Sequence, residues 1–264
     1  MADGSDKRAD ERSGTVGKAL AVLDEVARYG RPVRFSELID DSPYPKATLY
    51  RLVQTLTGEG MLAFDPDRQT YAPGIRLVRL AHSAWAQASL APIARPFLDT
   101  LSAETGETVH LAQLDAAQVL YVDKRNAQDP LPMYSQAGKV GPAYCTGVGK
   151  AMMAFLPDHE LSAVIAQQSF HSFTKHTLST EAALRHELGA IAARGHAYDR
   201  EEHEPGIICV AVPVKTSAGR VLGAISVTSS TDRTTLTQLE AYLPQITATS
   251  EAIAAEASSW RFPD

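Results

Sequence analysis

Carboxylates and a histidine crowd the segment from Asp199 to Cys209, which reads Asp-Arg-Glu-Glu-His-Glu-Pro-Gly-Ile-Ile-Cys. Four acidic residues and one histidine fall within its first six positions. Side chains of these types are typical of a polar pocket rim or a metal site, and equally of an acidic surface loop. The segment is therefore a candidate for ligand binding, and its neighbours in the fold must decide between these interpretations.

A thiol at Cys209 raises the hypothesis of nucleophilic catalysis. A reactive cysteine needs an accessible position and a base that lowers its pKa, and His203 or His110 could supply the base. Cys209 stands between Ile208 and Val210 in the middle of an expected strand, which favours a packed thiol. An enzyme that uses Cys209 as its nucleophile is thus the less favoured hypothesis. The favoured one, a packed thiol, assigns no catalytic residue.

Metal binding through His171, His176 or His203 is a further alternative. The eight histidines are dispersed along the chain and no paired-cysteine spacing accompanies them, which favours surface positions. We predict no metal site and no cofactor.

Two strands expected over residues 207–214 and 221–228 bring small, weakly polar side chains together. The residues on one face are Ile207, Cys209 and Ala211 of the first strand and Ala224, Ser226 and Thr228 of the second. A hairpin closed by Lys215 and Arg220 would place Cys209 opposite Ser226, and Ile207 opposite Thr228. Such a patch could form the floor of a ligand pocket or pack without any ligand.

A glycine-rich segment, residues 142–151, reads Pro-Ala-Tyr-Cys-Thr-Gly-Val-Gly-Lys-Ala and opens an expected helix over Thr146–Phe155. The unpaired N–H groups of a helix start attract carboxylates and phosphates, and Thr146 is placed to cap this one. A full phosphate-binding loop is missing, because only Gly147 and Gly149 precede Lys150 and an alanine follows it. The glycines could also serve close packing of the helix against a sheet.

A second kind of chemistry, DNA recognition, is indicated by the helix expected over Lys46–Thr57. Leu49, Leu52, Val53 and Leu56 form one apolar stripe. The opposite side carries donors suited to bases and phosphates, namely Lys46, Thr48, Tyr50, Arg51 and Gln54. Arg68 stands at the tip of an expected hairpin. It could belong to a wing that contacts phosphate or the minor groove, or it could be a solvated arginine in a turn.

The elements before and after this helix predict a winged helix-turn-helix. Helices are expected over 16–29 and 35–39, then a turn of Asp41-Ser42-Pro43-Tyr44-Pro45, and after the third helix short strands over 61–64 and 70–72. A helix over 74–88 follows, with apolar residues beyond a single stripe, including Trp85. We interpret it as a linker helix that pairs with a second chain.

The remaining sequence alternates strands and helices, which predicts an α+β domain with an antiparallel sheet flanked by helices. A strand hairpin is expected over 108–114 and 118–124, another strand over 131–135, and one long helix over 235–258. The predicted organisation is a disordered polar tail over 1–13, the winged helix over 14–75, the linker over 76–90 and the second domain over 91–264.

Composition limits the function classes. Hydrophobic residues make up 44% of 264 and charged residues 21%, which is ordinary for a globular protein. The net charge of −6 is confined to residues 81–264, whereas residues 14–80 carry +1, so DNA binding needs basic groups sorted to one face. Neither a signal peptide nor an apolar run of membrane-spanning length is evident, and two cysteines suggest a reducing cytoplasm.

Three stretches together resemble the IclR family of transcriptional regulators, over about residues 14–258. They are Gly14-Thr-Val-Gly-Lys-Ala-Leu with Pro45-Lys-Ala-Thr-Leu-Tyr-Arg-Leu-Val-Gln-Thr-Leu and Gly60-Met-Leu, then Cys145-Thr-Gly-Val-Gly-Lys-Ala, then the spaced set Gly195, Asp199, Glu202 and Cys209-Val-Ala. The resemblance implies a winged helix-turn-helix, a linker helix and a GAF-like effector domain. It also implies homodimers or homotetramers on palindromic double-stranded operators.

The same resemblance implies a small organic effector, such as an acid or a sugar-derived metabolite, that modulates operator binding. It places effector contacts at Gly147, Val148, Asp199, Ile207, Cys209, Ser226 and Thr228. We therefore expect a cytoplasmic regulator of metabolic, catabolic genes, with no membrane association.

Overall fold

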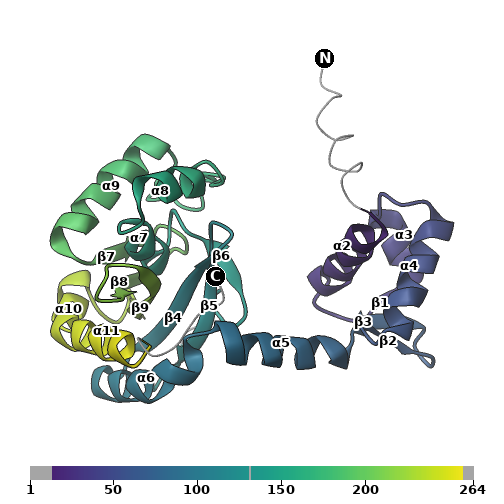
Figure 1. The fold of residues 1–264 in the computed structure, drawn as a ribbon, viewed down its shortest axis with the longest axis horizontal. Coiled ribbons are helices and arrows are strands. Elements are labelled where there is room, and N and C mark those ends of the chain that lie inside the picture. The colour runs from purple at the N-terminus through teal and green to yellow at the C-terminus, as the bar shows by residue number, and fades with distance from the viewer. Residues whose placement is uncertain (1–13, 131, 258–264) are drawn as a thin grey trace. The chain divides into compact units, whose positions relative to one another are not determined.

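The structure, a computed structural model, describes residues 14–130 and 132–257 (Figure 1). The expected disordered tail over residues 1–13 lies outside the described residues. The chain divides into two compact units, Met1–Trp85 and Ala86–Asp264, and each is described by itself.

The N-terminal unit is a winged helix-turn-helix. Its elements are α2 (Thr15–Arg28), β1 (Val33–Arg34), α3 (Phe35–Asp41), α4 (Lys46–Gly58), β2 (Leu62–Asp65), β3 (Thr70–Pro73) and the greater part of α5 (Ile75–Ala88). The strands form an antiparallel sheet in the order β1-β3-β2. The apolar stripe of α4 is buried with Val22 and Val26 of α2 and Leu38 of α3, so the sequence period places the polar side of α4 outward.

The start of α5 is fixed to this unit. Gly74 N–H donates to the Met61 carbonyl, and Arg76 bonds Glu59 in the turn after α4. A Cβ at Gly74 would lie 2.2 Å from the Gly60 carbonyl oxygen, so only glycine permits this approach of the two backbones.

The C-terminal unit is built on an antiparallel six-stranded sheet in the order β6-β5-β4-β9-β8-β7. These strands are β4 (Thr108–Asp115), β5 (Gln118–Arg125), β6 (Val140–Pro142), β7 (Ala197–Arg200), β8 (Ile207–Lys215) and β9 (Val221–Ser230). The central strands β4, β8 and β9 are almost wholly buried, because helices cover both faces of the sheet. The α+β prediction is confirmed.

One face of this sheet is covered by α6 (Ala91–Thr105), α10 (Leu236–Glu240) and α11 (Leu243–Ala257). The other face is covered by α7 (Gly147–Met153), α8 (Asp158–Ile165) and α9 (Glu181–Arg194), as Figure 1 shows. Met152, Ile165 and Leu188 of these three helices share a core with Cys209 and Ala211 of β8. Helix α7 lies directly on the sheet, so its first residues meet the central strands.

The pairing of β8 with β9 differs by two residues from the expected register. Cys209 pairs with Thr228, and Ala211 with Ser226. The loop is closed by Lys215 and Val221, one residue later than expected, and a bulge at Val214/Lys215 adds the second residue. Because side chains alternate with a period of two, this error leaves the same side chains on the same face.

Two other expectations were wrong. Residues 132–135 form no strand, and the short strand lies further along as β6. Pro132 has no N–H to give to a ladder, which explains the failure. The long C-terminal helix is divided into α10 and α11, because Pro244 near the start of α11 cannot continue the hydrogen bonding of α10.

Candidate functional site

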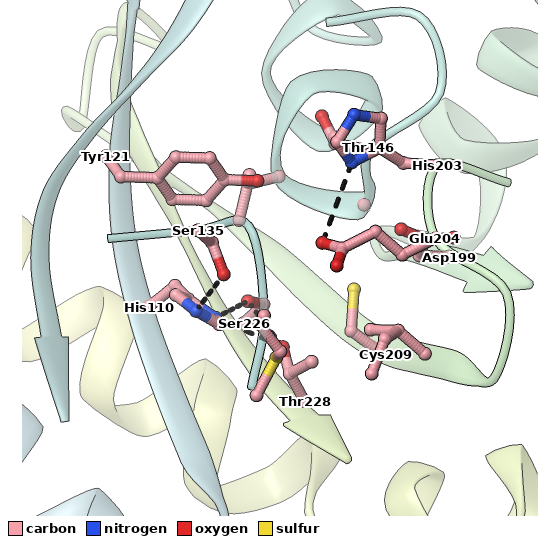
Figure 2. Close-up of a pocket in the computed structure, with 14 residues that line it drawn as sticks. His110, Tyr121, Ser135, Thr146, Asp199, His203, Glu204, Cys209, Ser226 and Thr228 are labelled. Atoms are coloured by element: carbon pink, nitrogen blue, oxygen red, sulfur yellow. Dashed lines mark hydrogen bonds and ion pairs between the residues drawn. The ribbon is translucent and has the colours of Figure 1, made fainter. Parts of the chain in front are cut away.

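A cavity opens between α7 and the centre of the six-stranded sheet (Figure 2). About 380 Å³ of atom-free space lies within this cavity and its open mouth, solvent at the mouth included. Its lining consists of His110, Tyr121, Met133, Ser135, Thr146, Gly147, Val148, Asp199, His203, Glu204, Ile207, Cys209, Ser226 and Thr228. All seven side chains or backbone positions expected to contact an effector are in this set.

The order of the strands explains why these distant residues meet. Asp199 of β7 is paired with Cys209 of β8, which is paired with Thr228 of β9. Three neighbouring strands thus present one row of residues to the same face, and Gly147 and Val148 of α7 lie across that row.

The glycines of α7 permit this close approach. A Cβ built at Gly147 would lie 2.3 Å from Cys209 Sγ and 3.4 Å from the Ala211 Cβ, and one at Gly149 would lie 2.3 Å from the Ala143 carbonyl oxygen. Close helix packing, one of the two alternatives for this segment, is therefore present, and the cavity lies beside the same helix start.

Thr146 does not cap α7 with its side chain, contrary to expectation. It occupies the N-cap position, but its Oγ1 donates to the Pro142 carbonyl oxygen at 2.8 Å. The preceding turn offers that acceptor within reach of the Thr146 side chain, and the hydroxyl proton is used there.

Four polar side chains form a hydrogen-bonded array on the sheet side of the cavity (Figure 2). His110 of β4 bonds Thr228 Oγ1 through Nδ1 at 3.2 Å and Ser135 Oγ through Nε2 at 2.8 Å. Ser226 Oγ lies 3.2 Å from Thr228 Oγ1. Burial, reinforced by the nearby Lys124 ammonium, lowers the pKa of His110 to about 3, so the imidazole is neutral at physiological pH.

Asp199 is the buried acid of the cavity. Burial, with repulsion from the Glu202 carboxylate, raises the pKa of Asp199 to about 7, although the Glu202 N–H bonds its Oδ1 at 2.8 Å. Behind it, the Lys150 ammonium in the middle of α7 bonds Glu202 Oε1, and both side chains are buried. This ion pair connects α7 to the loop that carries His203 and Glu204.

Aromatic rings surround His203 at the edge of the cavity. Its ring meets Tyr134 and Phe173 edge-on, with centroids 5.5 and 4.8 Å away. Beside it, the Glu204 carboxylate accepts from the Tyr134 N–H at 3.1 Å. Burial opposes ionisation of Glu204, but the His203 ring and this N–H together bring the pKa of Glu204 below its ordinary value.

Cys209 has the environment of a packed thiol. It is buried, and burial raises the pKa of its thiol far above the ordinary value, which is opposite to what a nucleophile needs. Within the described ranges, no three His, Cys, Asp or Glu side chains lie together so as to hold a metal ion. No helix of the described residues is long and apolar enough to cross a membrane.

Three lining residues, Tyr121, Met133 and Ser135, were missed from the sequence, and His110 was considered only as a base. His110 stands in a buried strand, where a polar residue is itself a signal of a site. Met133 and Ser135 belong to a segment that was expected to be a strand and is irregular in the structure, so the expected alternation could not place them.

The residues expected to read DNA occupy the outer side of α4. Lys46, Tyr50, Arg51 and Gln54 are exposed, and Thr48 is half-buried. Tyr50 meets Phe35 of α3 edge-on, and Gln54 lies 3.4 Å from the Tyr71 hydroxyl of the wing. Arg68 is exposed in the turn between β2 and β3, where the Asp65 carboxylate accepts the N–H groups of residues 67 and 68.

Comparison with known proteins agrees with this arrangement. The family model of the IclR helix-turn-helix domain matches residues 15–66, and that of the bacterial transcriptional regulator IclR C-terminal domain matches residues 82–255. The chain belongs to the IclR family. It is accordingly a ligand-responsive transcriptional regulator that binds DNA, and nothing in these matches supports the enzyme hypothesis.

Among its relatives, the HTH-type transcriptional regulator XynR of Escherichia coli is 31% identical over 88% of this chain and 92% of its own. KdgR of Dickeya chrysanthemi is also 31% identical, over 86% of this chain and 74% of its own. The crystal structure of Thermotoga maritima IclR matches with a TM-score of 0.73 at 28% identity, covering 92% of this chain and 98% of that one. XynR and KdgR are both named as HTH-type transcriptional regulators.

The fold is also that of an IclR homolog from Microbacterium hydrocarbonoxydans complexed with 4-hydroxybenzoate. That chain matches with a TM-score of 0.79 at 18% identity, covering 93% of this chain and all of that one (100%).

Proposed function

We propose that this regulator binds a small organic effector in the cavity beside α7, and that occupancy of the cavity changes its affinity for a palindromic operator. The observation that supports this most directly is the lining of the cavity, where Gly147, Val148, Asp199, Ile207, Cys209, Ser226 and Thr228 come together from four elements. A ligand alters operator binding only by its difference in affinity for two states of the protein. In this proposal residues 14–75 bind DNA, residues 76–90 link the two domains, and residues 91–264 bind the effector.

The chemistry of the lining favours a small metabolite as the effector, either an acid or a sugar-derived compound. The carboxyl groups of Asp199 and Glu204 disfavour a multiply charged anion, and the hydroxyl groups favour a hydrogen-bonding partner. Metabolites of this kind are substrates of catabolic pathways, so we propose that the genes under control are catabolic. Burial raises the pKa of the Cys209 thiol, which is opposite to what a nucleophile needs and favours a binding role for the cavity.

On the DNA side, α4 acts as the recognition helix and the β2–β3 hairpin as the wing. Arg51 on the exposed side of α4 suits a bidentate contact to guanine, with Lys46 and Arg68 toward phosphates. The relatives' names, which include repressors, support a repressor as the working model. Because the proposed target is an operator, we propose that the protein acts in the cytoplasm.

We also propose a homodimer or homotetramer. Ile75, Val78 and Leu80 of α5 are 72%, 61% and 51% exposed, which is unusual for apolar side chains of one helix. Two copies would cover these residues and place two recognition helices on two half-sites.

The test uses fluorescence anisotropy with labelled DNA from upstream of the protein's own gene. The full chain should bind it in the nanomolar range and respond to a cognate small molecule, whereas Cys209→Leu should bind it without responding. Failure of the wild type to bind any upstream DNA more tightly than a scrambled duplex would refute the proposal.

A further inference from the structure

His110 is a buried histidine at the centre of the sheet that still faces the cavity. It stands on β4, opposite Ser226 of β9, and its side chain is 3% exposed. Both ring nitrogens lie against hydroxyl oxygens, at 3.2 Å for Thr228 and 2.8 Å for Ser135. With Ser226, this makes an array of three hydroxyl groups around one imidazole on a single wall of the cavity, as Figure 2 shows.

The array is held in place from three directions. Thr228 and Ser226 are on a central strand, His110 is on its neighbour, and Tyr121 meets the imidazole edge-on at 5.5 Å. Ser135 lies outside the sheet, but the Lys124 ammonium of β5 donates to its carbonyl oxygen at 3.0 Å. A ligand therefore meets a wall that is already ordered.

The array is electrically neutral. A neutral imidazole donates through one nitrogen and accepts through the other, and each hydroxyl both donates and accepts. In either tautomer the wall thus offers donors and acceptors side by side. A carboxylate can only accept and an ammonium can only donate, whereas a ligand hydroxyl satisfies both kinds of partner.

The carboxyl groups of the cavity also favour a ligand that carries hydroxyl groups. The lining contains two carboxyl groups, of Asp199 and Glu204, and no lysine or arginine. Carboxylates accept hydrogen bonds from hydroxyl groups, but they repel a second anionic group on a ligand.

Resting on the effector pocket proposed above, we infer that the effector is a polyhydroxylated aliphatic compound, and that His110 with Ser135, Ser226 and Thr228 reads its adjacent hydroxyl groups. His110 is then a specificity-determining residue. Its two ring nitrogens orient the hydroxyl groups of Ser135 and Thr228, and the imidazole itself stays neutral. The donors and acceptors of the wall disfavour simple alkanoates as best ligands, and the carboxyl groups of Asp199 and Glu204 disfavour dicarboxylates.

The experiment measures binding of matched probe pairs to the full chain by isothermal titration calorimetry. The pairs are threonate with butanoate and gluconate with hexanoate, which have equal charge and chain length and differ in hydroxyl groups. We expect at least one hydroxylated member to bind roughly 10- to 100-fold more tightly than its partner, since each hydrogen bond contributes several-fold. Equal or tighter binding of the alkanoates, or no aldonate binding at millimolar concentration, would overturn the inference.

Variants separate this inference from the proposed function. Ser135→Ala and Thr228→Val should reduce the affinity for the hydroxylated probe about 3- to 10-fold and leave the alkanoate unchanged, while Ser172→Ala, a serine outside the cavity, should change neither. If alkanoates bind best, alter operator binding and are lost in Cys209→Leu, the pocket stands and the inference on hydroxyl groups falls. If the binding of every probe is insensitive to Cys209→Leu, the pocket itself has been misplaced.

Discussion

Removal of the Lys150 ammonium should destabilise the C-terminal unit strongly. Lys150 is 0% exposed and Glu202 4%, and the ammonium is the partner of Glu202 Oε1, while Glu202 Oε2 already lies buried without a hydrogen bond. Lys150→Met would preserve the length of the side chain and leave a buried carboxylate beside Asp199. Breaking a buried ion pair from one side costs about 3–5 kcal/mol. For a domain of this size, that corresponds to a fall in Tm of roughly 6–20 °C.

The assay is thermal and urea unfolding of the full chain, followed by circular dichroism and intrinsic fluorescence. The double variant Lys150→Met/Glu202→Leu removes both charges and should recover most of the stability. Operator binding by the N-terminal unit should survive in both variants.

The reasoning fails if Lys150→Met costs less than about 1 kcal/mol, because the pair would then be no better than a solvent-exposed one. It also fails if the double variant is as unstable as the single one. In that case packing of the lysine stem, and not the uncompensated charge, would account for the loss.

The other predictions concern the DNA surface, the cavity and the assembly. Arg51→Ala should weaken operator binding by about 1–3 kcal/mol in an anisotropy titration, while Arg185→Ala, which changes an exposed arginine of α9, should leave it unchanged. Equal effects of the two substitutions would show that α4 is not the recognition helix. Cys209→Leu should abolish the effector response and keep DNA binding, at a stability cost of about 1–3 kcal/mol from overpacking; a normal response would place the pocket elsewhere. Asp199 holds its proton in the folded state up to about pH 7 and in the unfolded state only up to about its ordinary value, so its stabilising contribution declines between these values and is fully lost once the pH has risen through 7. Asp199→Asn should therefore flatten the decline in Tm between about pH 4 and 7, and a parallel curve would contradict this. Val78→Glu should shift the assembly toward monomers in analytical ultracentrifugation, whereas an unchanged mass would exclude α5 from the interface.

Local patterns were enough to predict most elements of this fold. The stripe of Leu49, Leu52, Val53 and Leu56 fixed which side of α4 is buried, because helix periodicity is a property of neighbouring residues. The same holds for the alternation in β8 and β9, which put Cys209 and Thr228 on one face although their partners were assigned two residues away. A bulge depends on the whole hairpin, so its position could not be predicted from the loop sequence.

Half of the cavity residues could be predicted from the sequence, with the help of family resemblance, because they lie at helix starts and on adjacent strands. His110 and Tyr121 belong to β4 and β5, and their approach to Thr228 depends on the pairing of β4 with β9 across more than a hundred residues. Ser135 reaches the cavity through an irregular segment held by Lys124. Contacts of this kind depend on tertiary pairing, which no single-segment pattern encodes.

The tight contact between Gly147 and Cys209 has a consequence for anyone who wishes to retarget this sensor by directed evolution. A methyl group at position 147 would overlap the Cys209 sulfur, and Ala211 would still be in contact after that sulfur was removed. The two positions therefore do not vary independently, because a side chain at position 147 requires a smaller residue at position 209. Diversity is better placed at Met133 and Ser135, whose irregular segment lines the same cavity and imposes no helix-to-sheet spacing. New ligand specificities should accordingly be reached through the irregular wall of the cavity, with the α7–β8 contact kept as the fixed frame.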